Sequence, residues 1–237
     1  MKKHLKLIIF IITIISIYLI YTLTNKNNLI YVSIGDSLSL GENSYGATNY
    51  GYSDYFKDYL QKNELLSGYN KTFTDKTKTI NDIYKDLLTD KKTLIENNSY
   101  NLKRLLREAH IVTMSIGLND LIFEYNINQK PLTIYEEDRI VTKVFDNYQN
   151  LIQEIKKYYK YPIYIIGYYE NNTKYDNLIK KLNAKYKKYS QKNNDIYIDT
   201  TFISKNNIYF DNPNSYYPNN LAYKEISKKI IRLYQKN

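Results

Sequence analysis

Short apolar runs alternate with longer amphipathic stretches along most of this chain. The runs are rich in β-branched and aromatic residues and end at Gly or a polar residue, as buried strands do; they lie at 29–34, 110–116, 162–167 and 195–199, with a weaker run near 69–74. Helical periodicity covers 51–62, 80–89, 99–108, 138–159, 174–192 and 219–235. Strands separated by helices of this length form βαβ units, so the pattern predicts a three-layer α/β/α sandwich with a parallel sheet.

Three long irregular stretches interrupt this pattern, at 39–50, 121–137 and 200–218. No internal repeat and no Pro- or Gly-rich linker divides the body, so we expect one domain over residues 29–237. In open α/β sheets the ligand crevice lies at the carboxyl ends of the strands. The residues directly after each strand are therefore the functional candidates, and the irregular stretches are expected to surround them.

The N-terminal segment is strongly apolar. Residues 7–25 carry no charge between Lys6 and Lys26, and this length suffices for a helix to cross a bilayer. Lys2, Lys3 and Lys6 precede the apolar run, which predicts a short cytoplasmic tail and an exported body.

A cleaved signal peptide is the alternative interpretation of this segment. Its apolar region is normally shorter and ends in a small-x-small cleavage site, which residues 20–23 do not offer. The sequence favours an uncleaved anchor, with residues 1–28 forming the tail, the membrane helix and a short joint. The protein is then a single-pass cell-membrane protein with its 29–237 domain outside the cytoplasm; under the alternative it is secreted.

Charge and residue types exclude several kinds of function. The formal net charge is +10, but the basic residues are interleaved with acids along amphipathic stretches, which is typical of solvated helix faces and not of nucleic-acid binding. The chain has no Cys, so a thiol nucleophile and a thiolate zinc site are excluded. Its two histidines, His4 and His110, are too few for a multi-histidine metal centre. We predict no metal and no cofactor.

Two polar blocks directly follow predicted strands. The first reads Ile34-Gly35-Asp36-Ser37-Leu38-Ser39-Leu40-Gly41, and the second reads Ser115-Ile116-Gly117-Leu118-Asn119-Asp120. With these two blocks in this order, the body resembles the GDSL family of serine esterases and lipases, also called SGNH hydrolases. The resemblance implies their flavodoxin-like fold, with Ser37 as the nucleophile and the side-chain amide of Asn119 as an oxyanion-hole donor. Asp36 and Asp120 are interpreted as carboxylates that fix loops.

The chain departs from the pattern of this family at four positions. The backbone oxyanion donor, usually a glycine after the second strand, aligns with Thr77. In the closing block, Tyr217 stands at the position of the family's histidine base and Asn214 at that of its aspartate. Ala222 replaces a glycine at the start of the last helix. The usual Asp-x-x-His is therefore missing.

No other residue replaces the histidine in an obvious way. His110 begins the third predicted strand in chain order, the run at 110–116, so it is expected about 20 Å from the carboxyl end of the sheet. Tyr217, with an ordinary pKa near 10, is only about one part in a thousand ionised at pH 7. Asp211 is a remaining candidate.

Two functions follow from the resemblance and its departures. One is a membrane-anchored extracytoplasmic ester hydrolase that acts on a small-molecule, lipid or glycan ester. The other is an inactive relative that binds an acylated lipid or a cell-envelope glycan.

Overall fold

The centre of the fold is a five-stranded sheet in which every neighbouring pair of strands is parallel. Its strands, in spatial order, are β2 (Leu66–Asn70), β1 (Leu29–Gly35), β5 (Ile111–Ser115), β6 (Ile163–Ile166) and β7 (Ile196–Ile198). The computed structural model describes residues 11–17, 29–48, 50–90, 92–95, 98–128, 131–171, 173–212 and 216–236. The predicted parallel sheet is confirmed, although β2 begins earlier than the run at 69–74 because Gly68 weakens the strand pattern.

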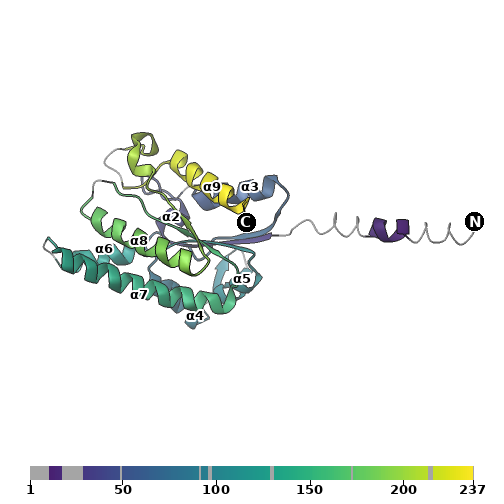
Figure 1. Ribbon diagram of the computed structural model, residues 1–237, viewed down its shortest axis with the longest axis horizontal. Helices are drawn as coiled ribbons and strands as arrows, with labels where there is room; N and C mark the ends of the chain where they lie inside the picture. Colours follow the sequence, from purple (N-terminus) through teal and green to yellow (C-terminus); the bar gives the residue numbers. More distant parts are fainter. Residues whose placement is uncertain are drawn as a thin grey trace, which may run out of the picture.

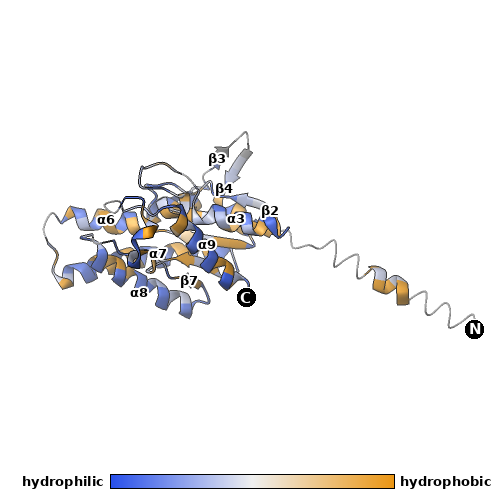
Figure 2. Cartoon of the chain, turned by 90° about the horizontal axis from the view of Figure 1, so that it is seen from above, coloured by the Kyte–Doolittle hydropathy of each residue, from blue (hydrophilic) through white to orange (hydrophobic). Residues whose placement is uncertain are grey.

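Helices cover both faces of this sheet and make the three predicted layers (Figure 1). One face carries α3 (Tyr52–Lys62) and α9 (Asn220–Tyr234), which pack against each other. The other face carries α4 (Ile80–Leu88), α5 (Leu102–Glu108), α6 (Leu118–Ile127), α7 (Ile134–Tyr158) and α8 (Asp176–Lys192). Hydrophilic and hydrophobic residues alternate along α7, α8 and α9 in Figure 2, as expected for helices with one buried face.

Tyrosine makes up much of the core. Seven tyrosines are among the largest fully buried side chains: Tyr31, Tyr52, Tyr148, Tyr159, Tyr168, Tyr186 and Tyr223. A buried tyrosine needs a partner for its hydroxyl. Tyr31 shares a hydrogen bond with Thr113 at 2.8 Å, and Tyr186 donates to the carbonyl of Ile116 at 2.9 Å. Six of the seven hydroxyls have a hydrogen-bond partner among the described residues, and the hydroxyl of Tyr148 has none there.

Two elements differ from the sequence prediction. Helix α6 occupies much of the stretch 121–137 that was expected to be irregular. Its apolar residues lie on both sides of the helix, because Leu118 and Leu121 are buried whereas Phe123 and Ile127 are exposed. The sequence therefore shows no single apolar stripe. The second difference is a hairpin of β3 (Lys92–Ile95) and β4 (Asn98–Asn101), which takes the first residues of the helix predicted over 99–108. Its polar sequence lacks the alternation of a half-buried strand.

The N-terminal segment is described only over residues 11–17. These residues are helical, and their isoleucines are exposed. In the part of the chain that the structure describes, no helix has both the length and the apolar character needed to cross a membrane. The rest of the span predicted over residues 7–25 lies outside the described residues.

Gly35 is the last residue of β1 and determines the direction in which the chain leaves the strand, so its replacement tests the fold. Its φ is +134°, and a Cβ would lie 1.8 Å from the carbonyl oxygen of Ser115. We expect Gly35→Ala to lower the free energy of unfolding by at least about 3 kcal/mol, since backbone strain and the clash act together. Gly68→Ala is the control, because its Cβ would meet Ile30 at an ordinary 3.7 Å. Urea unfolding followed by circular dichroism measures both; equal stability of the two variants would contradict this account.

Candidate active site

The two polar blocks meet at the point where the strand order reverses. The chain passes from β1 to β2 on one side and then to β5 on the other side of β1, and the loops after β1 and β5 lie where open α/β sheets have their ligand crevice. Ser37 is the first residue of the short helix α2 (Ser37–Leu40), which follows β1. Asn119 lies in the first turn of α6, which follows β5. The fold thus brings both predicted residues to one edge of the sheet.

A buried carboxylate holds the turn before Ser37. Asp36 is 1% exposed and caps α2, its Oδ1 accepting from the N–H of Leu38 at 3.2 Å. The hydroxyl of Ser115 donates to the same oxygen at 2.7 Å, and the hydroxyl of Tyr168 donates to Oδ2. Burial raises the pKa of Asp36 to about 6, while these hydrogen bonds oppose the rise. Asp36 therefore fixes the loop, as its position in the sequence indicated.

The side chain of Ser37 is half-buried and makes no hydrogen bond to the described residues. Among the described residues, neither its hydroxyl nor its backbone N–H has a hydrogen-bond partner, whereas its carbonyl accepts from Gly41 at 2.9 Å and Glu42 at 3.1 Å. A hydroxyl in this state is available to a ligand. Within the described residues, no basic side chain is hydrogen-bonded to the Ser37 hydroxyl.

A small cavity adjoins Ser37. Its volume is about 10 Å³, which is room for a single water molecule. Most of its lining is aromatic or aliphatic. The lining residues are Ser37, Leu38, Leu118, Pro218 and five tyrosines, namely Tyr168, Tyr169, Tyr216, Tyr217 and Tyr223. Tyrosine rings thus occupy the space beside the candidate nucleophile.

The side-chain amide of Asn119 is bonded to the loop after β2. Its Nδ2 donates to the carbonyl of Lys76 at 3.0 Å and to that of Lys78 at 2.8 Å. A carboxamide nitrogen has two hydrogens, so both are used. To act as an oxyanion donor, Asn119 must exchange one of these carbonyls for the substrate oxygen.

Thr77 lies in the same loop and is exposed. Its N–H donates to Oδ1 of Asp75 at 2.8 Å, and its hydroxyl donates to the same oxygen at 2.6 Å. This is an Asx turn that engages the backbone donor expected for the oxyanion hole. The donor role predicted for Thr77 requires this turn to open.

Asp120 joins the same loop to α6. Both of its carboxylate oxygens accept from the N–H of Ile80, at 3.0 and 3.3 Å. Burial raises the pKa of Asp120 to about 6. Its predicted role as a loop-fixing carboxylate is confirmed by these bonds.

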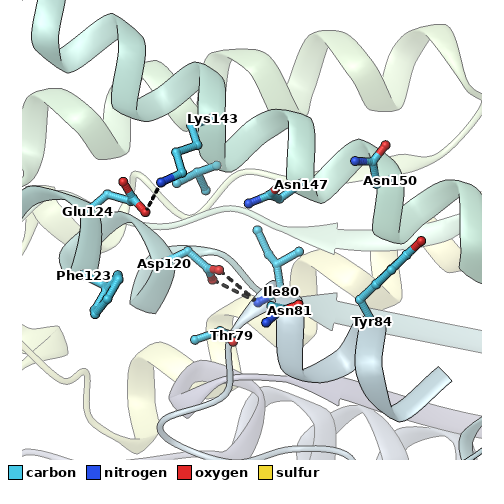
Figure 3. Close-up of a pocket in the computed structure, with 11 residues that line it drawn as sticks. Thr79, Ile80, Asn81, Tyr84, Asp120, Phe123, Glu124, Lys143, Asn147 and Asn150 are labelled. Atoms are coloured by element: carbon cyan, nitrogen blue, oxygen red, sulfur yellow. Dashed lines mark hydrogen bonds and ion pairs between the residues drawn. The ribbon is translucent and has the colours of Figure 1, made fainter. Parts of the chain in front are cut away.

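A larger groove opens beside Asp120. Its volume is about 490 Å³, and Figure 3 shows its side chains projecting from α4, α6 and α7. Three asparagines, Asn81, Asn147 and Asn150, contribute amide groups, and Lys143 pairs with Glu124 at 2.7 Å. The groove therefore combines amide groups with apolar side chains such as Ile80, Phe123 and Val144, and Lys143 is neutralised by an acid.

The segment that replaces the family's Asp-x-x-His is only partly described. Tyr217 lines the small cavity together with Ser37, while Asn214 lies outside the described residues. Burial, followed by the charge of Glu42, raises the pKa of Tyr217, so its phenol stays protonated at neutral pH.

Neither of the other bases considered from the sequence reaches Ser37. His110 lies before β5, at the amino end of the sheet, where its Nδ1 accepts from the N–H of Ile30 at 3.2 Å. Asp211 is exposed and accepts from the side chain of Asn219, the cap of α9, at 3.1 Å.

Sequence reasoning missed Glu42. This residue is 3% exposed and lies two residues beyond the end of α2, where the hydroxyl of Tyr217 faces its carboxylate. One sequence signal was present, because Glu42 is the single charged residue between Asp36 and Asp54. A lone acid in a stretch of Gly, Asn, Ser and Tyr differs from the acids that alternate with lysines on the helix faces.

Within the described ranges, no group of three or more His, Cys, Asp or Glu side chains is arranged to hold a metal ion. The polar atoms of the crevice are instead backbone N–H groups, hydroxyls, one amide and carboxylates.

Comparison with known proteins agrees with this geometry. The model of the GDSL-like lipase/acylhydrolase family matches residues 33–224. No curated protein matches the sequence. Solved structures of similar fold include a lipase from a goat rumen metagenome, with 17% identity, a TM-score of 0.67, and coverage of 86% of this chain and 97% of that chain.

Two further structures have the same fold at similarly low identity. An acetylxylan esterase from Geobacillus stearothermophilus has 18% identity and a TM-score of 0.60, with 87% of this chain and 95% of that chain covered. A phospholipase A1 from Streptomyces albidoflavus has 13% identity and a TM-score of 0.60, with 86% and 99% covered.

The raised pKa of Asp120 predicts a pH dependence of stability. Its folded pKa of about 6 lies above the ordinary 3.8, so the folded state binds more protons and this contribution to stability grows as pH falls from about 7 to about 4. Relative to Asp120→Asn, the wild-type protein should gain up to about 1.4 kcal/mol per pH unit between pH 6 and 4. Urea titrations at several pH values measure it; a constant difference between the two proteins would contradict the assignment.

Proposed function

The chain belongs to the GDSL-like lipase/acylhydrolase family, and we propose that it is a serine ester hydrolase with Ser37 as its nucleophile. One observation carries this proposal: the Ser37 hydroxyl has no partner in the described chain, yet Asp36 holds the turn that presents it at the sheet's switch point. A rigid turn with an unengaged hydroxyl meets the geometric requirement of nucleophilic attack, which in addition needs a base that takes the proton.

The groups around Ser37 suit acyl transfer. Ser37 Oγ attacks the ester carbonyl carbon, and the carbonyl oxygen becomes an oxyanion. The unengaged N–H of Ser37 is one donor to it, and the amide of Asn119 is a second once the oxyanion displaces a loop carbonyl. Thr77 is the third donor by family position, and it acts only when its turn with Asp75 opens.

The space at the site favours a short acyl group. A cavity of about 10 Å³ beside Ser37 has no room for a long acyl chain. The alcohol part of the ester then extends over the surface outside this cavity. The separate groove of about 490 Å³, which Asp120 of α6 lines, is of the size of small-ligand sites. Three asparagine amides in this groove suit the hydroxyls of a glycan. Among the substrates expected from the sequence, a short-chain glycan ester fits best.

A second candidate function is binding without turnover. It is favoured by the bonds that engage Asn119 and Thr77 and by the tyrosine at the position of the family's histidine. A serine site that lacks its base keeps only the catalysis of its oxyanion hole and its binding contacts. In this case the same crevice holds an acylated lipid or glycan.

Labelling with a fluorophosphonate separates the two functions. We expect the full-length protein in mild detergent to be labelled and to hydrolyse p-nitrophenyl acetate, and Ser37→Ala to lose both. Ser67→Ala is the matched control, because Ser67 is an exposed serine on β2, outside the crevice. An unlabelled and inactive wild-type protein would favour binding without turnover; labelling that survives in Ser37→Ala would place the nucleophile elsewhere.

We also propose that the protein is anchored in the cell membrane with its domain outside the cytoplasm. The support is the uncharged run over residues 7–25 and the lysines before it. We expect the full-length protein to remain in the membrane fraction after an alkaline carbonate wash. A Leu19→Arg/Ile20→Arg variant should be released, since arginine at the centre of a spanning helix is costly. Release of the unchanged protein would support secretion after signal cleavage.

A further inference from the structure

The carboxylate of Glu42 is buried and incompletely satisfied. Its side chain is 4% exposed, and no described group donates a hydrogen bond of standard geometry to Oε2. The nearest cation is the exposed Lys76, whose Nζ lies 3.9 Å from Oε1. A buried carboxylate normally has several donors, because desolvation of the charge is costly. Glu42 therefore differs from Asp36, which accepts three hydrogen bonds.

The backbone fixes Glu42 beside the candidate nucleophile. Its N–H donates to the carbonyl of Ser37 at 3.1 Å, and its own carbonyl accepts from the hydroxyl of Tyr223 at 2.6 Å. The hydroxyl of Ser44 donates to the carbonyl of Tyr217 at 3.3 Å, which ties the loop after Glu42 to the C-terminal segment. Tyr217 lines the Ser37 cavity and also faces Glu42, so its side chain borders both groups. The Ser37 hydroxyl must turn toward Tyr217 for a proton to pass between them.

We propose that Glu42 is the terminal proton acceptor of the site and that the hydroxyl of Tyr217 relays the proton from Ser37. This inference rests on the proposed hydrolase function and supplies the base that the missing histidine leaves open. Glu42 acts through Tyr217 and not on the substrate, so it is a positioning residue. The carboxylate comes from the loop after α2, whereas the family's aspartate belongs to the closing block.

The proton and the bonds balance over two half-reactions. In the first, Ser37 Oγ bonds to the acyl carbon while its proton passes to the Tyr217 oxygen and the phenolic proton passes to Glu42. The tetrahedral intermediate then breaks its bond to the alcohol oxygen, which takes the proton back from Glu42 through Tyr217. In the second half, water attacks the acyl carbon and one of its protons passes through Tyr217 to Glu42. The bond from the acyl carbon to Ser37 Oγ then breaks, Oγ takes this proton back through Tyr217, and the acid is released.

The relay needs ionised Glu42 and neutral Tyr217. Burial raises the pKa of the Glu42 carboxyl above its ordinary value, while the Lys76 charge and the Tyr217 hydroxyl oppose this rise. Activity should therefore fall as pH decreases through the raised pKa of Glu42. The titratable groups that face Glu42 and Tyr217 are Lys76 and Asp75 of the loop after β2, Tyr223 of α9 and Asp36 of the nucleophile turn.

The first test removes the charge of Glu42 in the full-length protein. At pH 7, Glu42→Gln should lower the rate of fluorophosphonate labelling and the kcat for p-nitrophenyl acetate on the order of 100-fold. The acidic limb of the pH profile should disappear in Glu42→Gln and remain in Glu42→Asp. Glu154→Gln is the matched control, because the Glu154 side chain is 9% exposed, pairs with Lys157 at 2.6 Å and lies on α7. It should leave rate and pH profile unchanged.

The second test is a gain of function, which a folding defect does not imitate. Tyr217→His places an imidazole between Ser37 and Glu42, and we expect labelling at least about tenfold faster than in the wild-type protein. The Tyr217→His/Glu42→Gln double variant should lose this gain. No gain, or a gain that survives the loss of the Glu42 carboxylate, would overturn the inference.

The outcomes distinguish the inference from the function on which it rests. A wild-type rate and pH profile in Glu42→Gln, with Ser37→Ala inactive, would overturn the role of Glu42 and leave the hydrolase proposal intact. Absence of labelling in the wild-type protein would overturn both. Thermal unfolding of each variant shows whether it is folded. Where Glu42→Gln is not folded, Glu42→Asp replaces it in the pH profile and the gain in Tyr217→His alone decides.

Discussion

The buried carboxylate of Asp36 is the interaction on which the site depends. It receives hydrogen bonds from its own helix, from Ser115 at the end of β5 and from Tyr168 just beyond β6. One side chain thus links three neighbouring segments at the carboxyl edge of the sheet. Because an ionised group is stable inside a protein only with such donors, the three segments must keep their relative positions. Ser37 directly follows Asp36, so the hydrogen bonds of Asp36 also fix the backbone position of Ser37.

The tyrosines that build the core also shape the crevice. Tyr168 belongs to the buried core and at the same time lines the cavity beside Ser37, as do Tyr169 and Tyr223. Their rings supply apolar contact, and their hydroxyls bond to Asp36, to the carbonyl of Tyr216 and to the carbonyl of Glu42. The same side chains therefore fill the core and donate hydrogen bonds to its polar groups. Their rings also occupy the space beside Ser37. The narrow cavity is a consequence of how this core is assembled.

Sequence patterns predicted the sheet well because its strands are short, apolar and bounded by polar residues. They failed for α6, whose exposed Phe123 and Ile127 remove the amphipathic stripe, and for the polar β3–β4 hairpin. At the site, the two blocks predicted where Ser37 and Asn119 would lie. The bonds from Asn119 to the loop carbonyls were not predictable, because they depend on how the loop after β2 closes against α6. Contacts between distant segments carry no local sequence pattern.

The contrast between Asp36 and Glu42 bears on how a site without histidine works. Both are buried carboxylates, Asp36 directly before α2 and Glu42 shortly after it. Asp36 accepts three hydrogen bonds, whereas no described group donates one to Oε2 of Glu42. Leaving Glu42 short of donors destabilises its charged form, and a carboxylate in that state binds a proton more readily than a satisfied one. Tyr217 is the neutral group placed to deliver that proton, and its ring also lines the cavity that contains Ser37. The same incomplete satisfaction that weakens the folded state would make Glu42 a better acceptor than a fully bonded carboxylate.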